Sequence, residues 1–175
     1  ADLLGKKLKE FTFHIRDITK KLDMQNKMHE LAFHDVLTGL FNRNYFKEKL
    51  TYEISFANRH RRNCLLMFLD LDHFKDINDT LGHEAGDQLL RHVAASLNKC
   101  VRAEDIICRW GGDEFLILFP NLEKHDIAST KAEEIIQILH APISVNGREV
   151  FAQVSIGLAI SKYGKVEAQQ LIQRA

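Results

Sequence analysis

The chain has 175 residues and carries 24 basic side chains (Lys and Arg) against 24 acidic ones, so its formal net charge is zero. This length favours one domain with a short appendage, and a hydrophobic content of 45% supplies enough apolar material for a buried core. The low net charge together with many apolar residues argues against an intrinsically disordered chain, and the lack of a basic excess argues against a protein that coats DNA or RNA. A small anionic ligand held by a few placed groups is still compatible with these figures.

The cysteine content and the apolar runs bear on the cellular compartment. Three cysteines without CxxC spacing argue against a disulfide scaffold or a zinc site and fit a reducing cytoplasm. The longest apolar run, at residues 64–69, is far shorter than the about 20 residues that a membrane helix needs. We therefore expect a cytoplasmic fragment without membrane contact of its own, although a longer parent protein could be membrane-attached.

The hydrophobic pattern predicts alternating strands and helices along the chain. Taken in order, the expected elements are a strand at 11–15, helices at 17–34 and 45–58, a strand at 64–72, a helix at 81–101, strands at 106–110 and 115–119, a helix at 127–140, a hairpin at 143–150, a strand at 151–161 and a helix from 166. Residues 74–87 are expected to form a loop. This order predicts an α+β fold (an α/β sandwich) with a mixed sheet and helices packed on it.

Two aspartates end the strand expected at residues 64–72. Because side chains alternate along a strand, Asp70 and Asp72 share one face, while the leucines between them point to the other. Carboxylates that follow a buried apolar run are costly unless they are solvated, paired or bound to a metal. Taken alone, the pattern is more typical of a polar strand end that leads into a loop.

A glycine pair separates the next two apolar strands. Gly111 and Gly112 tolerate the positive φ of a tight turn, and Asp113 and Glu114 present carboxylates at its tip. The alternative is an ordinary surface hairpin with solvated acids, but both flanking strands are strongly apolar, which favours a central hairpin. Its acids would then meet Asp70 at one edge of the sheet. Three carboxylates in one place indicate Mg²⁺, a hard cation that prefers oxygen ligands.

The connection at residues 74–87 contains candidates for base recognition. Asn78 offers both a hydrogen-bond donor and an acceptor, and Asp87 offers acceptors only, a combination that suits the edge of a guanine base. The alternative for Asn78 is a role as a helix cap, which is common for this residue type.

Several ordered motifs resemble one known family. The segment RWGGDEF at residues 109–115 is similar to the signature of the GGDEF family, the bacterial diguanylate cyclases. The resemblance extends through DVLTGLFNR at 35–43, FLDLDHFKDINDTLGHEAGD at 68–87 and SIGLAIS at 155–161, and covers about residues 33–175. It implies a fold similar to nucleotide cyclases and the polymerase palm, with a ferredoxin-like, mainly antiparallel central sheet.

The resemblance implies a metal-dependent reaction that joins two GTP molecules into cyclic di-GMP and releases two pyrophosphates. The implied ligands of Mg²⁺, or of Mn²⁺ in its place, are Asp70, the backbone carbonyl of Leu71, Asp113 and Glu114. Asp113 and Glu114 are both implied to be catalytic; Asp113 is a candidate general base or metal ligand, and the sequence does not separate these roles or decide between Asp113 and Glu114 as the base. One domain holds one GTP, so catalysis implies a homodimer.

The resemblance also implies a substrate site and an inhibitory product site. The implied substrate-binding residues are His73, Phe74, Lys75, Asn78, Asp87, Arg109, Gly111 and Gly112. Backbone groups of the first three would cradle the phosphates, Asn78 and Asp87 would read the guanine, and Arg109 would brace the signature or contact the nucleotide. Arg102 and Asp105 form an RxxD motif at the family's site for cyclic di-GMP, although a lone pair of this kind is usually a surface ion pair of little energetic weight.

The resemblance divides the chain into two regions. Residues 1–34 resemble the last strand of a PAS sensor domain followed by a signalling linker helix, and residues 35–175 resemble the catalytic domain. The linker helix would pair with its twin in a dimer or, equally, pack on its own domain. The family's C-terminal helix usually continues with further basic residues, so this helix is expected to be truncated here.

Two other function classes compete with the enzyme. One is a non-catalytic module that binds cyclic di-GMP or GTP and regulates a partner, and the other is a purely structural dimerisation module. The intact acids and the retained Asn78 and Asp87 favour the enzyme, because receptors often lose them and a structural module has no use for clustered carboxylates.

Overall fold

A computed structural model describes residues 20, 21, 24, 28, 30–122, 127–145, 147–162 and 166–175. The chain divides into two compact units, residues 1–33 and residues 34–175. In the first unit the described residues are helical, while the predicted strand at 11–15, and with it the PAS-like strand, lies outside the described residues. Within the described part of the chain, no helix has the length and apolar character needed to cross a bilayer.

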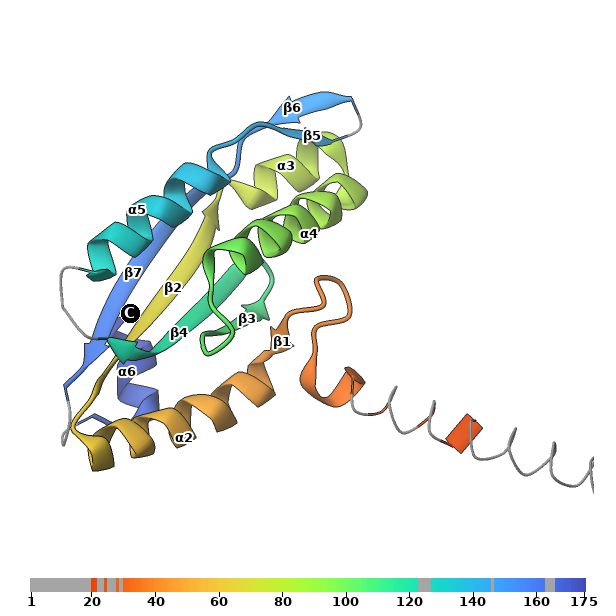
Figure 1. The fold of residues 1–175 in the computed structure, drawn as a ribbon. Helices are drawn as coiled ribbons and strands as arrows, with labels where there is room; N and C mark the ends of the chain where they lie inside the picture. Colours follow the sequence, from red (N-terminus) through yellow and green to blue (C-terminus); the bar gives the residue numbers. More distant parts are fainter. Residues whose placement is uncertain are drawn as a thin grey trace, which may run out of the picture. The chain divides into compact units, whose positions relative to one another are not determined.

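A five-stranded mixed sheet forms the centre of the second unit (Figure 1). Its order is β1-β3-β4-β2-β7, with β1 parallel to β3 and every other neighbouring pair antiparallel. The strands are β1 (Phe41–Asn42), β2 (Asn63–Asp72), β3 (Ile106–Gly111), β4 (Glu114–Leu122) and β7 (Gln153–Ser161), and β5 (Ile143–Val145) and β6 (Arg148–Val150) form a separate hairpin. The predicted mainly antiparallel sheet with flanking helices is confirmed.

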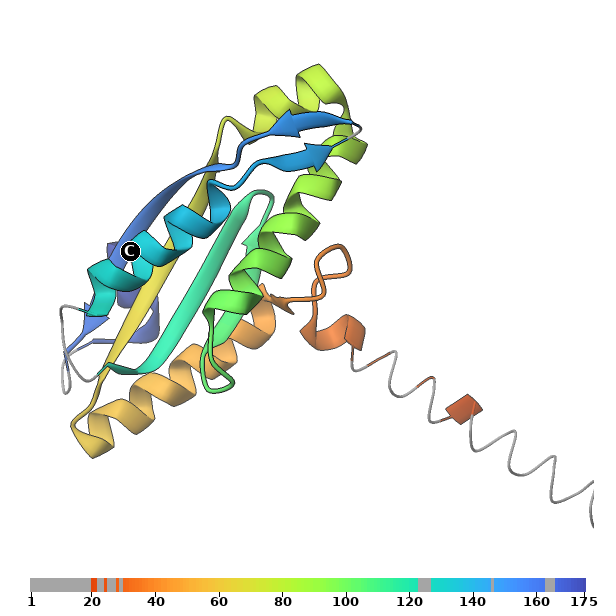
Figure 2. The same cartoon turned by 45° about the horizontal axis from the view of Figure 1, so that its top comes forward.

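Helices cover both faces of the sheet (Figures 1 and 2). They are α2 (Arg43–His60), α3 (Phe74–Leu81), α4 (His83–Cys100), α5 (Ile127–Leu139) and α6 (Ala168–Arg174). The strand β2 serves two cores: Leu65 and Met67 pack with α4 and α5, while Cys64 and Leu66 pack with α2 and α6. This double burial explains why β2 reads as a nearly continuous apolar run.

The segment at residues 74–87 was expected to be a loop, and this expectation is wrong. Residues 74–81 form helix α3, and α4 follows after one intervening residue, Gly82. Phe74, Ile77 and Leu81 recur at helical spacing and pack against the core beneath α4. Gly82 has φ +87° and ψ 159°, a positive-φ conformation that favours glycine and that separates α3 from α4.

Candidate active site

Acidic side chains meet where β2 and β4 pair. Asp70 lies directly opposite Glu114 in the antiparallel register, so the two side chains share one face of the sheet. Because Leu66 on β2 and Leu116 on β4 belong to the core under α2 and α6, alternation places both acids on that side. Asp113 occupies the tip of the turn.

The two glycines make this turn possible. Gly111 and Gly112 are exposed between β3 and β4, and Gly112 has φ +55°, a conformation that favours glycine. The pairing of β3 with β4 shifts between Arg109 and Gly111, which marks a bulge next to the acids. Bulges of this kind re-aim side chains near functional sites.

Burial and like charges act together on these acids. Burial raises the pKa of Asp70, and the charges of Asp113 and Asp72 raise it further. Burial also raises the pKa of Glu114, with Asp70 and Asp113 adding repulsion and Arg43 opposing it. The site therefore concentrates negative charge that a cation would neutralise.

The donor chemistry of this edge fits a hard cation such as Mg²⁺. Carboxylate oxygens of Asp70 and Glu114 face the same side, and Leu71 buries its side chain, so only its backbone can offer a ligand atom. Asp72 is held differently, because it accepts a hydrogen bond from Ser155 Oγ at 2.7 Å. Among the described residues no group of three His, Cys, Asp or Glu side chains is placed to hold a metal. The carboxylates alone therefore do not supply all the ligands that a metal ion needs.

The turn from β2 into α3 presents backbone amides near these acids. His73 has φ +59°, and α3 begins without a side-chain hydrogen bond that caps its N-terminus. Amides at the start of a helix attract anions through their hydrogen atoms and the helix dipole. Phe74 and Lys75 begin this helix, and the Lys75 side chain is exposed beside it. This turn suits a phosphate group.

The pair predicted to read guanine lies at the contact of α3 and α4. The Asn78 side chain lies against Gly86, where its Oδ1 and Cγ are the atoms that an added Cβ would meet first. Asp87 is the next residue of α4 after Gly86, and it is half-buried, as is Asn78. The absence of a side chain at Gly86 therefore leaves the room that the Asn78 amide occupies.

Arg109 is engaged within the protein. Its Nε and Nη2 donate to the carbonyl of Gly112 at 3.0 and 2.7 Å, and its Nη1 donates to both carboxylate oxygens of Asp35 at 3.2 and 3.3 Å. Burial raises the pKa of Asp35, but hydrogen bonds from Thr38 and the charge of Arg109 outweigh this effect and leave the pKa below its ordinary value of 3.8. Sequence reasoning did not assign Asp35 to the site.

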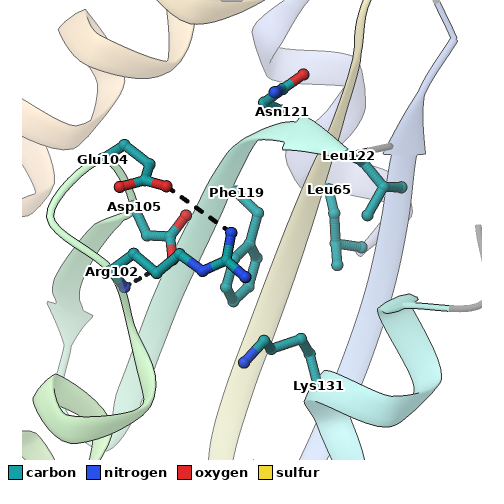
Figure 3. Close-up of a pocket in the computed structure, with 8 residues that line it drawn as sticks. All are labelled: Leu65, Arg102, Glu104, Asp105, Phe119, Asn121, Leu122 and Lys131. Atoms are coloured by element: carbon teal, nitrogen blue, oxygen red, sulfur yellow. Dashed lines mark hydrogen bonds and ion pairs between the residues drawn. The ribbon is translucent and has the colours of Figure 1, made fainter. Parts of the chain in front are cut away.

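Arg102 and Asp105 lie apart from these acids, in a pocket of about 150 Å³ between the loop before β3 and α5 (Figure 3). Its lining residues are Leu65, Arg102, Glu104, Asp105, Phe119, Asn121, Leu122 and Lys131. The backbone amide of Arg102 donates to Asp105 Oδ2 at 2.8 Å, while the Arg102 side chain is 74% exposed. Burial raises the pKa of Asp105, and the Arg102 amide opposes this shift.

Comparison with known proteins identifies the family. The sequence profile described as "Diguanylate cyclase, GGDEF domain" matches residues 32–175. The diguanylate cyclase TpbB of Pseudomonas aeruginosa is 40% identical over 130 residues, which are 74% of this chain and 30% of TpbB. The cyclic di-GMP phosphodiesterase NbdA of the same species is 34% identical over 148 residues, 85% of this chain and 19% of NbdA. The chain thus spans less than a third of each of these relatives.

The solved structure of the coiled coil and GGDEF domain of DgcB from Caulobacter crescentus, in complex with cyclic di-GMP, superposes with a TM-score of 0.82. It is 29% identical and covers 98% of this chain and 90% of that one. The chain belongs to the GGDEF family, whose members include diguanylate cyclases.

We expect Asp70→Asn to stabilise the metal-free protein, with a higher melting temperature at pH 7 than the wild type. The folded state raises the pKa of Asp70, so ionisation opposes folding above that pKa, and the penalty vanishes below the unfolded-state value of about 3.8. Thermal unfolding of both proteins, followed by circular dichroism between pH 7 and a pH below 3.8, checks the sign of this change in stability. A lower melting temperature of Asp70→Asn than of the wild type at pH 7 would contradict the repulsion between Asp70 and its acidic neighbours.

We expect Gly86→Ala to weaken nucleotide binding while leaving the protein folded, because the new methyl group would displace the Asn78 side chain. Loss of one guanine hydrogen bond corresponds to a rise in Kd of about 10-fold. Titration calorimetry with GTP measures it, and Ala85→Gly, one residue earlier on α4, serves as a stability control. If the folded Gly86→Ala protein bound GTP with wild-type affinity, the prediction that Asn78 reads guanine would be wrong.

Proposed function

We propose that this chain is a diguanylate cyclase domain that condenses two GTP molecules into cyclic di-GMP and two pyrophosphates. The observation that carries the proposal is the meeting of Asp70 and Glu114 on one face, beside the Asp113 turn and the uncapped start of α3. This arrangement joins a cluster of acids to an anion site, which is the requirement of nucleotidyl transfer. Membership of the family and the similarity to TpbB support it.

The proposed substrate site assigns one part of GTP to each feature. Asn78 and Asp87 hydrogen-bond the guanine edge, and the backbone amides of residues 73–75 hold the phosphates, with Lys75 adding positive charge. Arg43 reduces the negative field at Glu114. Binding through these groups fixes the α-phosphate near the acids without requiring a net positive charge on the whole chain.

In the proposed reaction, the 3′-hydroxyl oxygen of one GTP attacks the α-phosphorus of the other. The new O–P bond forms as the bond to pyrophosphate breaks, and a carboxylate of Asp113 or Glu114 accepts the hydroxyl proton. The same step in the opposite direction, from the 3′-hydroxyl of the second nucleotide to the α-phosphorus of the first, closes the ring and releases the second pyrophosphate. Asp70, the Leu71 carbonyl, Asp113 and Glu114 would hold Mg²⁺, or Mn²⁺ in its place. Such an ion supplies charge neutralisation at the transferring phosphoryl group.

A homodimer is part of this proposal, since two substrates must face each other from two domains. The helical residues Met24, Met28 and Leu31 are 67%, 67% and 66% exposed and recur at spacings of four and three, the pattern of a coiled-coil seam. DgcB, whose solved structure is described as a coiled coil and GGDEF domain, covers this helix as well. We propose that residues 1–34 comprise the end of a PAS-like strand and a signalling linker helix, and that this helix pairs two catalytic domains of residues 35–175.

The second candidate function is a non-catalytic module that binds cyclic di-GMP or GTP. The observation that favours it is the similarity to NbdA, which is named as a phosphodiesterase rather than a cyclase. The chain retains Asp70, Asp113 and Glu114, the acids that the proposed reaction uses, and this makes the non-catalytic module the weaker candidate.

Incubation with GTP and Mg²⁺, followed by chromatography of the nucleotides, tests the enzyme. The wild-type protein is expected to form cyclic di-GMP at a rate that rises with protein concentration through dimerisation. Asp113→Ala is expected to reduce the rate by at least about 100-fold because it removes a metal ligand or the base. Glu133→Ala, which removes an exposed carboxylate on α5, is the matched control. No product at any protein concentration would support the receptor function instead.

We propose that the pocket of Arg102 and Asp105 binds cyclic di-GMP as a feedback inhibitor. Arg102→Ala is expected to weaken cyclic di-GMP binding by about 10- to 100-fold, because an Arg contact to phosphate or guanine is charge-assisted. Calorimetry with cyclic di-GMP measures the affinity, and Arg91→Ala, an exposed arginine on α4, is the control. If cyclic di-GMP inhibited Arg102→Ala as strongly as the wild type, this pocket would not be the inhibitory site.

A further inference from the structure

The guanidinium of Arg109 spans two parts of the chain. On one side, Nε and Nη2 converge on the single carbonyl oxygen of Gly112, and on the other, Nη1 reaches both oxygens of Asp35, 74 residues away in the sequence. The side chains of Arg109 and Asp35 are only 15% and 23% exposed, so water competes poorly for these charge-assisted bonds. The contact is therefore unlike an ordinary surface ion pair.

Asp35 is itself fixed by its own turn. Its Oδ1 accepts hydrogen bonds from the backbone amide of Thr38 at 2.9 Å and from Thr38 Oγ1 at 2.7 Å. Its backbone amide donates to the carbonyl of Leu40 at 2.8 Å, and its carbonyl accepts from the amide of Gly39 at 2.9 Å. These bonds hold the carboxylate in one direction, toward Arg109.

The turn at residues 35–40 is anchored to the sheet next to the strand that carries Arg109. Strand β1 follows the turn and runs parallel to β3, with Asn42 in register with Arg109. The guanidinium is carried by β3 and the carboxylate by the turn that leads into the neighbouring strand β1, so the pairing of these two strands brings the turn close to Arg109. Asp35 and Arg109 form a bridge between the first turn of the domain and the turn that carries the signature acids.

We propose that Asp35 is a positioning residue for catalysis, acting through Arg109 on the peptide between Gly112 and Asp113. The Gly112 carbonyl and the Asp113 amide belong to the same planar unit, so fixing the carbonyl fixes the direction in which Asp113 leaves the turn. Glycine at φ +55° has several accessible conformations, and the Arg109 bonds select one of them. The catalytic part of this inference rests on the proposed cyclase function.

This role predicts a specific kinetic pattern. In the proposed site, the protein groups that bind guanine and phosphate are at residues 73–75, 78 and 87, outside the turn that carries Gly112. Loss of Asp35 should therefore lower kcat and leave KM for GTP nearly unchanged. A misplacement of a catalytic group by a fraction of an ångström to 1 Å lowers the rate by about 10- to 100-fold. If Arg109 instead contacts the nucleotide, its loss should raise KM.

The experiment compares Asp35→Ala, Asp35→Asn, Arg109→Ala and the Asp35→Ala/Arg109→Ala double variant, with Glu134→Ala as a control that removes a surface ion pair of 2.7 Å on α5. We expect kcat to fall about 10- to 100-fold in Asp35→Ala and less in Asp35→Asn, which keeps an acceptor for Thr38. The double variant should be no worse than Arg109→Ala alone. Wild-type kcat in a folded Asp35→Ala protein, or a rise in KM without a fall in kcat, would overturn the proposal.

A second measurement separates this inference from the proposed function. The amide resonances of Gly112 and Asp113, recorded by NMR without nucleotide, should shift or broaden in Asp35→Ala and stay in place in Glu134→Ala. If the wild-type protein forms no cyclic di-GMP, the cyclase function fails, while these resonances still report on the bridge. Unchanged resonances in Asp35→Ala would show that Asp35 does not position the turn, whatever the activity of the wild type.

Discussion

The repulsion between carboxylates at the end of β2 and β4 is the interaction on which the rest of the site depends. Asp70 and Glu114 face the same side of the sheet, and Asp113 adds charge from the turn, so burial and like charges both disfavour ionisation. Such an arrangement is unfavourable for folding unless ligands with positive charge compensate it. The Arg43 side chain supplies part of that compensation at Glu114 from the protein itself.

The sheet imposes this repulsion because its register leaves no alternative. The strand β2 is buried on both faces and paired on both edges, so sliding it by one residue would move every side chain into the opposite core and disrupt the packing of both. The apolar interior of β2 thus holds the acids together at its end. Stability of the core and chemistry at the edge are two consequences of the same strand.

Much of this fold was accessible from the sequence because its signals are local. The apolar run that ends at Asp70, the glycine pair of the β3–β4 turn and the helical spacing of α4 each lie within a short window. Helix α3 was missed because the polar residues between Phe74, Ile77 and Leu81 resemble a loop. The three- and four-residue spacing of these apolar residues was the one signal in the sequence that could have predicted the helix.

The side-chain pairings of the site could not be predicted in the same way. Arg109 and Asp35 are 74 residues apart, and Ser155 and Asp72 are 83 apart, so nothing in a local window links them. The sequence also does not show that Gly86 leaves room for the Asn78 side chain, because this contact depends on how α3 and α4 pack together. Motifs thus indicated which residues matter, whereas only the tertiary structure showed that Asp72 is held by Ser155 and Arg109 by Asp35.

The position of β7 in the sheet has a consequence for how the protein folds during synthesis. One entire edge of β2, from Cys64 to Asp72, pairs with β7, which is made only after most of the domain has left the ribosome. Until residue 161 emerges, β2 has an unpaired, strongly apolar edge that can pair with other chains. We expect the nascent domain to be prone to aggregation at that stage; chaperone binding would cover the exposed edge, and fast translation of the last third of the domain would shorten its exposure.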